Sequence, residues 1–271
     1  MNTLEIIRRR RSTRTFDGSA LRDQDAQRIM EFAGKVENPY QIPIEWRLLD
    51  AKQSMLSSPV IVGADSFLAG KLRRAPHAEE AFGYTMEKVV LFAQSIGVGT
   101  TWIAGTMDRG AFERAMALSD GEVMPCVSPL GYPAKKMSLR ETMMRKGIQA
   151  DSRLAFSRLF FDSCLDTPLT AEKAGKLADV FETVRWAPSA VNKQPWRAVL
   201  CGEHVHFYEK RSKGYVSSEG WDIQKIDMGI ALSHFELAAE ACGLDASFYL
   251  SDPGLSVQDD TVYIASFAIK A

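Results

Sequence analysis

Residues 186–197 read Trp186-Ala-Pro-Ser-Ala-Val-Asn-Lys-Gln-Pro-Trp-Arg197, and they end one element and begin another. Pro188 cannot continue the helical pattern that precedes it, and Ser189 and Asn192 are turn formers. The stretch therefore predicts a tight polar loop between two tryptophans. Its hydroxyl and amide groups can bind the edge of a planar heterocycle, but they cannot by themselves perform acid–base or nucleophilic chemistry. An ordinary helix-to-strand turn would have the same pattern.

The composition is that of an ordinary globular protein. The chain has 271 residues, and its 33 Lys and Arg nearly balance its 34 Asp and Glu. This balance creates no field that favours nucleic acid or a membrane surface. No apolar run approaches the roughly 20 residues that span a bilayer, and none at the N-terminus is long enough for a signal peptide. We therefore expect a cytoplasmic protein that binds neither nucleic acid nor membrane.

The cysteines and histidines indicate neither disulfides nor a metal site. The four cysteines are scattered, with no Cys-x-x-Cys pair, as expected of reduced thiols in a cytoplasmic protein. The four histidines have no ligand partners at zinc spacing. His204 and His206 alternate along an expected strand, so they more simply mark one strand face. We expect no metal.

Several landmarks recur at a nearly constant distance along the chain. Gly83 and Gly229 lie 146 residues apart, and so do Gly97 and Gly243. Trp46 and Trp196 lie 150 apart, and Phe16 and Phe161 lie 145 apart. These offsets predict an internal duplication, with an α+β half at residues 1–150 and another at 151–271. The long apolar helices of the two halves are expected to pack together, which makes the chain a monomer that acts as a pseudo-dimer.

Hydrophobic periodicity and turn residues predict the elements. Helices are expected at 2–11, 23–33, 81–96, 108–118, 166–186 and 227–243. Strands are expected at 46–49, 59–62, 127–133, 196–200, 204–208, 247–250 and 262–269. Residues 98–105 should form a strand and loop, and the polar, Met-rich residues 134–152 are expected to be a linker.

The densest positive cluster is Arg8–Arg11 with Ser12 and Arg14. Arginine binds phosphate through a fork of donors, so this arm predicts a phosphate site, although a solvated helix end would have the same composition. Gly97–Gly105 is rich in glycine and could let backbone N–H groups approach a flat ligand. The chain has no Walker loop, no G-x-G-x-x-G, and no recognisable catalytic triad or carboxylate pair. These features favour a protein whose organic cofactor does the chemistry.

The motifs together resemble the FMN-dependent nitroreductase family, and most closely its fused branch with tandem halves. The resemblance rests on Arg10-Arg-Ser-Thr-Arg-Thr-Phe16, Ala187–Trp196, Asp227-Met-Gly-Ile-Ala followed by Gly243-Leu, and Gly131-Tyr-Pro133. The Ala-Pro-Ser-Ala-x-Asn-x-Gln-Pro-Trp loop is the most specific of these. The resemblance implies an α+β fold of mixed and antiparallel sheets with helices packed around them, and FMN held between the halves.

The resemblance also implies site residues, all of which bind cofactor. Those that bind the flavin phosphate and ring edge are Arg10, Arg11, Ser12 and Arg14. Those that reach the flavin from the opposite half are Pro188, Ser189, Ala190, Asn192 and Gln194. Those that present backbone N–H groups are Ile103, Ala104 and Gly105. A basic residue after Pro133, either Arg140 or Arg145, completes the phosphate clamp. The first half has lost the Ser-Asn loop pattern at residues 38–46, so a second, symmetric site is in doubt.

The resemblance implies an oxidoreductase in which NAD(P)H reduces FMN, and FMN reduces a nitroaromatic, quinone or similar acceptor by a ping-pong mechanism. No catalytic side chain is identified. One alternative keeps the fold but changes the reaction, because related flavoproteins dehalogenate aromatics or fragment flavin with oxygen. Another is a flavin-binding or sensing protein without turnover. A basic-arm nucleic-acid binder is disfavoured by the near-zero net charge.

Overall fold

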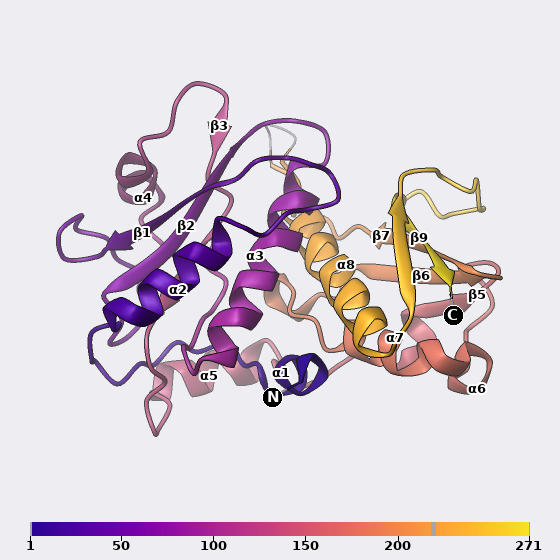
Figure 1. Cartoon of the computed structure of the whole chain (residues 1–271), viewed down its shortest axis with the longest axis horizontal. Coiled ribbons are helices and arrows are strands. Elements are labelled where there is room, and N and C mark those ends of the chain that lie inside the picture. Colours follow the sequence, from indigo (N-terminus) through magenta and orange to yellow (C-terminus); the bar gives the residue numbers. More distant parts are fainter. Residues whose placement is uncertain (1, 218–220, 271) are drawn as a thin grey trace. The chain divides into compact units, whose positions relative to one another are not determined.

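The computed structural model describes residues 2–217 and 221–270. The chain divides into two compact units, one of residues 9–150 and the other of residues 1–8 together with 151–271. The first eight residues therefore group with the second half of the sequence. Each unit contains a sheet and helices packed against it (Figure 1).

The unit of residues 9–150 is built on a small antiparallel sheet. Strand β2 (Ser66–Arg73) pairs with β1 (Glu45–Asp50), β3 (Glu122–Val123) and β4 (Val127–Leu130). Its helices are α2 (Asp23–Ala33), α3 (Ala78–Ser95), α4 (Arg109–Met116) and α5 (Leu139–Gly147). Gly70 of β2 faces Trp46, and a Cβ at this glycine would lie 2.6 Å from the indole ring. This close approach requires glycine.

Strand β2 is buried on both faces, and its alternating side chains belong to two hydrophobic clusters. Leu68 packs with residues of α2 and α3, including Ile29 and Val89. Phe67 on the opposite face packs with Phe112 of α4, whose ring lies edge-on to it at 5.1 Å. The two-residue period of a strand explains why neighbours in sequence enter different clusters.

The other unit contains a five-stranded sheet in the order β5-β6-β7-β9-β8. The strands are β5 (Phe160–Asp162), β6 (Trp196–Cys201), β7 (His204–Lys210), β8 (Asp245–Tyr249) and β9 (Thr261–Lys270). The α-helices are α1 (Thr3–Arg9, whose last residue falls in the other unit), α6 (Ala171–Ala174), α7 (Ala178–Arg185) and α8 (Ile223–Ala241). Short 3₁₀ turns are η1 (Phe156–Arg158), η2 (Gly175–Leu177) and η3 (Ala190–Asn192). Strand β5 pairs parallel with β6, and the other neighbours are antiparallel.

Aromatic side chains form the core of this unit. Phe235 of α8 lies 5.3 Å from Phe207 of β7, 4.9 Å from Phe267 of β9 and 5.9 Å from Phe181 of α7, measured between ring centroids. All four rings are fully buried. This cluster therefore fixes α7 and α8 on one face of the sheet.

The two units share a connectivity. In one, α2, β1, β2, α3, residues 98–105 and β4 follow in order; in the other, α7, β6, β7, α8, β8 and β9 do. β1–β2–β4 and β6–β7–β9 are both antiparallel. Val127 of β4 bridges to Ile103 and Gly131, just after β4, bridges to Gly99, in the place where β9 pairs with β8. Both long helices are followed by a glycine at positive φ, Gly97 and Gly243. This correspondence supports the predicted duplication.

Several expected elements differ from the structure. The strand at 59–62 is wrong: these residues form a turn and a single bridge, because the strand that pairs with β1 is β2, whose polar edge positions obscured it. The linker at 134–152 is also wrong, since it contains α5, capped by Ser138. The helix at 166–186 is divided, because Gly175 has a φ of 55° between α6 and α7.

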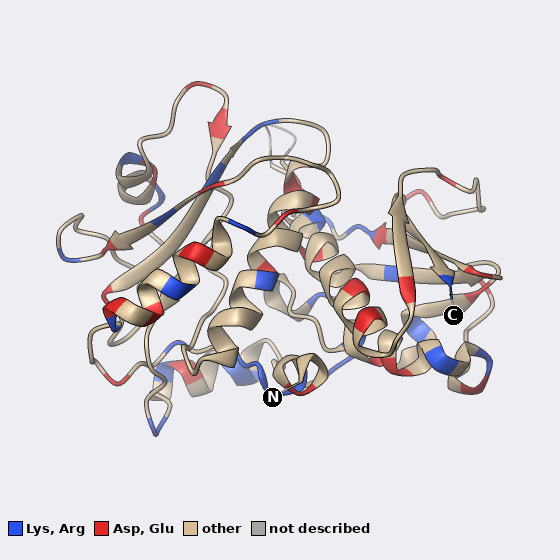
Figure 2. Ribbon diagram, in the orientation of Figure 1, with Lys and Arg blue, Asp and Glu red and all other residues tan. Residues whose placement is uncertain are grey.

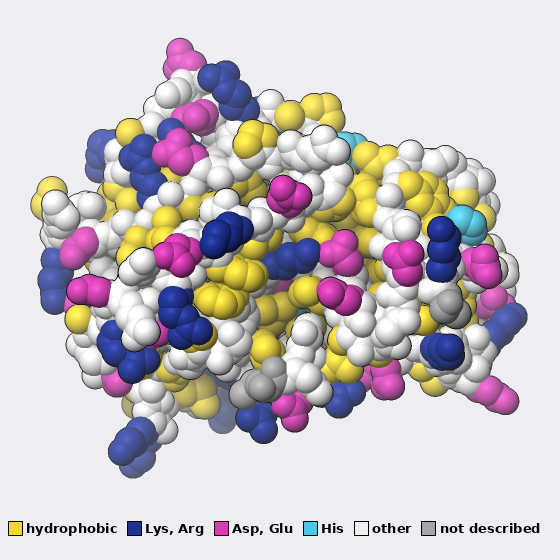
Figure 3. Space-filling view, in the orientation of Figure 1, with side chains coloured by type: hydrophobic (Ala, Val, Ile, Leu, Met, Phe, Trp, Pro, Cys, Tyr) yellow, Lys and Arg dark blue, Asp and Glu magenta, His cyan; other side chains and the backbone are white. Residues whose placement is uncertain are grey.

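The remaining expected helices and strands are confirmed to within a few residues. Residues 98–105 form isolated bridges rather than a strand. No helix among the described residues is both long enough and apolar enough to cross a bilayer. The face seen in Figure 3 intersperses basic and acidic side chains, consistent with the net charge of −1.

Candidate functional site

The arginine arm and the glycine-rich segment are adjacent within the unit of residues 9–150. Ser12 forms a parallel bridge with Thr100, and the Thr13 N–H donates to the Thr100 carbonyl at 2.8 Å. Gly99 allows this approach, because a Cβ there would lie 2.9 Å from Thr13 Oγ1. The structure thus brings together two segments that the sequence singled out separately.

Two arginines of the arm have side-chain nitrogens that are buried away from solvent. Arg10 is only 6% exposed, and its Nε and Nη1 atoms have no hydrogen-bond partner among the described residues; the same holds for Nη1 of Arg14. Burial lowers the pKa of both guanidinium groups, and neighbouring arginines lower it further. Guanidinium groups stay charged in proteins, so these unsatisfied N–H groups call for an anion.

Arg11 and Ser12 lie nearer the surface. The Arg11 side chain is exposed, and its Nη1 donates to the Arg10 carbonyl at 2.9 Å. Ser12 is half-buried at the bridge to Thr100. Of the four predicted arm residues, Arg10 is therefore the one most removed from water, and Arg14 is half-buried like Ser12.

Buried glutamates partly balance the arm. Glu87 of α3 is fully buried, with its carboxylate 3.8 Å from Arg10 Nε and accepting from Trp102 Nε1 at 3.1 Å. Glu141 of α5 is 4% exposed and accepts from Thr15 Oγ1 at 2.7 Å and from the Arg14 N–H at 3.3 Å. These carboxylates offset the arginine charge but leave the unpartnered donors unsatisfied.

Sequence analysis missed Glu141, although its signal was present. Ser138-Leu-Arg-Glu141 has the spacing of a helix capping box, and Ser138 Oγ does accept from the Glu141 N–H at 3.1 Å. The carboxylate does not return to the cap, because Thr15 Oγ1 accepts the Ser138 N–H instead. The helix is thereby tied to the arm.

The two candidates for the basic residue of the clamp differ in position. Arg145 lies close enough to lower the pKa of both Arg10 and Arg14. Arg140 is exposed and donates to the Pro59 carbonyl. Figure 2 shows basic segments at the arm and on α5. Arg145 is therefore the better placed of the two.

The predicted glycine edge is only partly available. Ile103 is buried, and its N–H and carbonyl both bond to Val127 at 2.9 Å. The Ala104 carbonyl accepts from Arg109 Nη2 at 3.0 Å. Gly105 is exposed, and a Cβ there would meet nothing within 4 Å. Ala104 and Gly105, rather than Ile103, can offer N–H groups without breaking a bond to β4.

In the other unit, the loop of residues 186–197 has an unusual backbone. Val191, Asn192 and Gln194 have φ values of 50°, 57° and 51°. Asn accepts the left-handed region, but a β-branched valine is strained there. Such conformations persist only where the surroundings fix them, and they cluster at functional sites. Pro188, Ser189 and Ala190, just before these residues, are half-buried.

Most polar side chains of the loop hold the loop itself. Ser189 Oγ accepts the Gln194 N–H at 2.9 Å, and Asn192 Nδ2 donates to the Ser152 carbonyl at 3.1 Å. Gln194 is 3% exposed; its Oε1 accepts from Leu154 N–H at 2.9 Å, and its Nε2 donates to the Asn192 carbonyl at 3.2 Å. The Gln194 amide therefore braces the loop.

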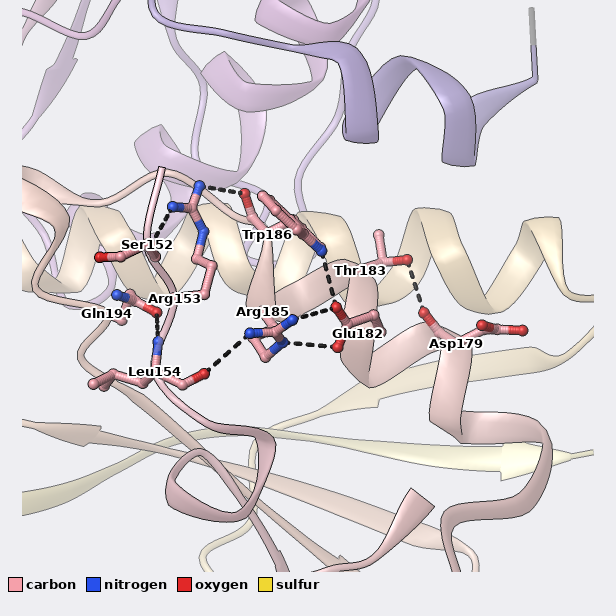
Figure 4. A network of polar contacts seen from close by, with 9 residues as sticks. All are labelled: Ser152, Arg153, Leu154, Asp179, Glu182, Thr183, Arg185, Trp186 and Gln194. Atoms are coloured by element: carbon pink, nitrogen blue, oxygen red, sulfur yellow. Dashed lines mark hydrogen bonds and ion pairs between the residues drawn. The ribbon is translucent and has the colours of Figure 1, made fainter. Parts of the chain in front are cut away.

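Residues 152–154, which hydrogen-bond to the loop, also contact the end of α7 (Figure 4). Arg153 Nη2 donates to the Trp186 carbonyl at 3.3 Å, and its guanidinium lies 5.0 Å from the Trp186 ring. Arg185 donates to the Leu154 carbonyl at 3.2 Å and makes a two-pronged ion pair with Glu182. Trp186 Nε1 also donates to Glu182, at 2.9 Å. These contacts fix where the loop starts.

A group of buried carboxyls lies behind the loop, and sequence analysis expected no such pairing. Asp227 of α8 is 3% exposed and accepts the Ala190 N–H at 3.0 and 3.1 Å through its two oxygens. Burial and the nearby Asp222 raise the pKa of Glu209 to about 7. Asp222 caps α8 by accepting from the Gln224 N–H at 3.0 Å. The three acids lie apart in sequence, so no local motif revealed them.

The donors described above fit an FMN phosphate in chemical terms. Two arginines with buried, unpartnered side-chain nitrogens, and a third arginine nearby, are what a dianionic phosphate requires. Among residues 2–217 and 221–270, no group of three or more His, Cys, Asp or Glu could hold a metal ion. The arm can bind an anion, and the braced loop can present backbone groups to a planar ligand.

Comparison with known proteins is consistent with these features. The model of a nitroreductase family, described as "Putative TM nitroreductase", matches residues 2–239. The chain therefore belongs to this family, whose membership supports oxidoreductase function in the broad sense. No curated protein matches the chain.

One of the solved structures to which the chain is similar supports the fold. A nitroreductase-like protein from Thermotoga maritima is 19% identical, with a TM-score of 0.64 over 99% of this chain and 94% of that one. A nitroreductase family protein from Clostridium novyi (18% identity, TM-score 0.42) matches 50% of this chain and 87% of its own. An FMN-dependent nitroreductase from Clostridium difficile (13% identity, TM-score 0.43) matches 49% and 88%. The first of these shows that the fold is nitroreductase-like.

Proposed function

We propose that this protein is an FMN-dependent oxidoreductase that uses NAD(P)H to reduce nitroaromatic, quinone or similar acceptors. The observation that carries the proposal is a set of three buried guanidinium nitrogens with no hydrogen-bond partner among the described residues: Nε and Nη1 of Arg10 and Nη1 of Arg14. Glu87 and Glu141 offset part of the arginine charge, but in a protein that bound no anion there these desolvated donors would stay without hydrogen bonds. A phosphate group removes this cost and adds charge-assisted hydrogen bonds.

The residues have distinct roles in this proposal. Arg10, Arg14 and Arg145 bind the phosphate, while Arg11 and Ser12 extend the clamp toward the flavin. Ala104 and Gly105 offer backbone N–H groups to the ring. The loop of residues 188–194 provides further backbone contacts, in a conformation fixed by Ser189, Asn192 and Gln194.

Bound FMN would supply hydride transfer from the nicotinamide to the acceptor in two half-reactions. The chain's own part is to bind the phosphate, orient the ring and limit access of water. No side chain of the arm or the loop is required as a nucleophile.

A spectrum of purified protein reconstituted with FMN tests the proposal. The expected result is a flavin absorbance that stays with the protein on gel filtration and bleaches anaerobically with NADH or NADPH. Protein that retains flavin but is inert to both nicotinamides would contradict the oxidoreductase and favour a flavin sensor. Protein that retains no flavin would contradict both.

A test with different electron acceptors distinguishes the proposed reductase from a flavin-dependent dehalogenase. Reduced protein mixed anaerobically with a nitroaromatic, a quinone and a halogenated phenol should reoxidise with the first two. Release of halide from the third, without reaction of the others, would point to a dehalogenase of the same fold.

A further inference from the structure

A buried carboxylate on α8 contacts the loop that the proposed function assigns to flavin. Asp227 directs both oxygens at a single backbone donor, the Ala190 N–H, at 3.0 and 3.1 Å. Asp227 lies in the second turn of α8 and is 3% exposed. A carboxylate that is withdrawn from water is unfavourable unless its contacts compensate for the lost hydration. For Asp227, these compensating contacts are its hydrogen bonds to the Ala190 N–H.

The contact falls where the loop needs support. Ala190 directly precedes Val191, whose φ of 50° is strained for a β-branched residue, and Asn192 follows with a φ of 57°. Gln194 and Asn192 brace the far side of the turn, through Leu154 and Ser152. Asp227 fixes the near side. The turn is thus held at both ends, which is the condition for a strained backbone to persist.

The electrostatic setting of Asp227 indicates that it is not a general packing residue. Glu209 and Asp222 act on it electrostatically, and all three are buried, with burial as the main cause of the raised pKa of the Asp227 carboxyl. Arg211 Nε lies 3.7 Å from Glu209 and 3.6 Å from Asp222. An apolar side chain at residue 227 would avoid this desolvation, but it would leave the Ala190 N–H without its acceptor.

The other unit offers an internal comparison. With the offset of 146 that aligns Gly83 with Gly229, the counterpart of Asp227 on α3 is Ala81. With the offset of 150 that aligns the tryptophans, the counterparts of Ser189 and Asn192 are Pro39 and Ile42. The copy that lacks the polar loop therefore also lacks the acid. In this chain the half with the polar loop has the acid, and the other half has neither.

We infer that Asp227 is the positioning residue of the flavin loop: by accepting the Ala190 N–H, it holds residues 190–192 in the conformation that binds FMN. This inference rests on the proposed function. Asp227 acts through the loop and does not itself take part in hydride transfer.

The test compares Asp227→Ala with Asp222→Ala. Both changes remove a buried carboxylate from the same acidic group on the same helix, but Asp222 bonds to Gln224 rather than to the loop. Asp227→Asn keeps one acceptor oxygen. The measurements are the FMN dissociation constant by flavin fluorescence, the melting temperature, and amide hydrogen exchange in peptides that cover residues 186–197 of the flavin-free protein.

We expect Asp227→Ala to weaken FMN binding by about tenfold or more, because an N–H group left without its acceptor costs free energy on this scale. Exchange in the loop should accelerate, Asp222→Ala should change FMN binding less than about threefold, and Asp227→Asn should restore much of the affinity. Equal loss of FMN affinity in both alanine variants would overturn the inference, as would faster loop exchange with unchanged affinity. Wild-type protein that binds no FMN would overturn the proposed function, and loop exchange alone would then decide whether Asp227 holds the loop.

Discussion

Two loops at equivalent places in the two units differ in nearly every polar contact. Residues 186–197 lead into β6, and residues 36–47 lead into β1; each ends near a tryptophan, Trp196 or Trp46. The later loop contains a hydroxyl and two amides, is strained, and bonds to Asp227. In the earlier loop, Asn38 closes a turn on Ile42, with hydrogen bonds of 2.8 and 3.2 Å.

The earlier loop also has a ring where the later one has a methyl group. Tyr40, the counterpart of Ala190, stacks on His77 with 5.1 Å between ring centroids. Under the proposed function, the same connectivity therefore supports a ligand-binding loop in one unit and a packed turn in the other. The outcome depends on a few side chains rather than on the backbone plan, and we propose that this chain has kept one flavin site of two.

The arm gives the largest expected effect. Arg14→Ala should weaken FMN binding by about ten- to a hundredfold, because a hydrogen bond between charged groups contributes about 1.5–3 kcal/mol. Flavin fluorescence titration measures the affinity. Arg140→Ala is the matched control, since Arg140 bonds to the Pro59 carbonyl, and it should change the affinity less than about twofold. Equal affinity in wild type and Arg14→Ala would show that the arm is only a basic surface.

Glu209→Gln tests the acidic group behind the later loop. The Glu209 pKa is about 7 in the folded protein and 4.5 in its ordinary state, so folding takes up a proton. This contribution to stability is complete below about pH 4.5 and is lost as the pH rises through 7. The amide should remove the loss, on the order of 2–3 kcal/mol by pH 8.

Thermal unfolding of wild type and Glu209→Gln between pH 5 and pH 8 measures this effect. The melting temperature of the variant relative to wild type should rise with pH. A difference that stays constant, or falls, across this range would mean that Glu209 is ionised in the folded protein at pH 5.

Asn192→Ala should act on flavin binding more than on folding. Asn192 holds the turn through the Ser152 carbonyl and accepts a positive φ better than alanine does. We expect FMN affinity to fall about three- to tenfold with a small drop in melting temperature. Asn38→Ala removes the equivalent support from the earlier loop and should lower only the melting temperature. Similar flavin affinities in the two variants would erase the distinction between the loops.

The smallest effect is expected for Tyr40→Ala. Loss of the ring on His77 should cost about 1 kcal/mol of stability. It should neither change FMN affinity beyond about twofold nor create a second flavin site, because Ile42 and Ile44 still lack donors. Binding of a second FMN by this variant would show that Tyr40 alone blocks the symmetric site.

Sequence predicted the long helices well, because apolar periodicity and a following glycine define α3 and α8. It also predicted the arm and its neighbour, the glycine-rich segment, as separate features. It missed α5, since its short amphipathic pattern lies among polar residues and only Ser138–Glu141 marks its start. It missed β2 because Ser66, Lys71 and Arg73 interrupt the apolar run.

The part of the candidate site that could not be predicted from the sequence depends on contacts between residues far apart in the chain. Glu87 and Glu141 meet the arm from two different helices. Asp227 reaches Ala190 across 37 residues. The pKa of Glu209 depends on its burial and on Asp222, neither of which a local pattern encodes. The bond of Ile103 to Val127 likewise became visible only when the strands were paired.

The number of FMN molecules per chain tests whether only one of the two halves has kept a flavin loop. Protein reconstituted with excess FMN and freed of unbound flavin should be denatured, and the released flavin compared with chain concentration. We predict a ratio of FMN to chain near one, in protein that sediments as a monomer. A ratio near two would show that the earlier loop also serves a flavin and would contradict the account, and a ratio near zero would contradict the assignment of FMN itself.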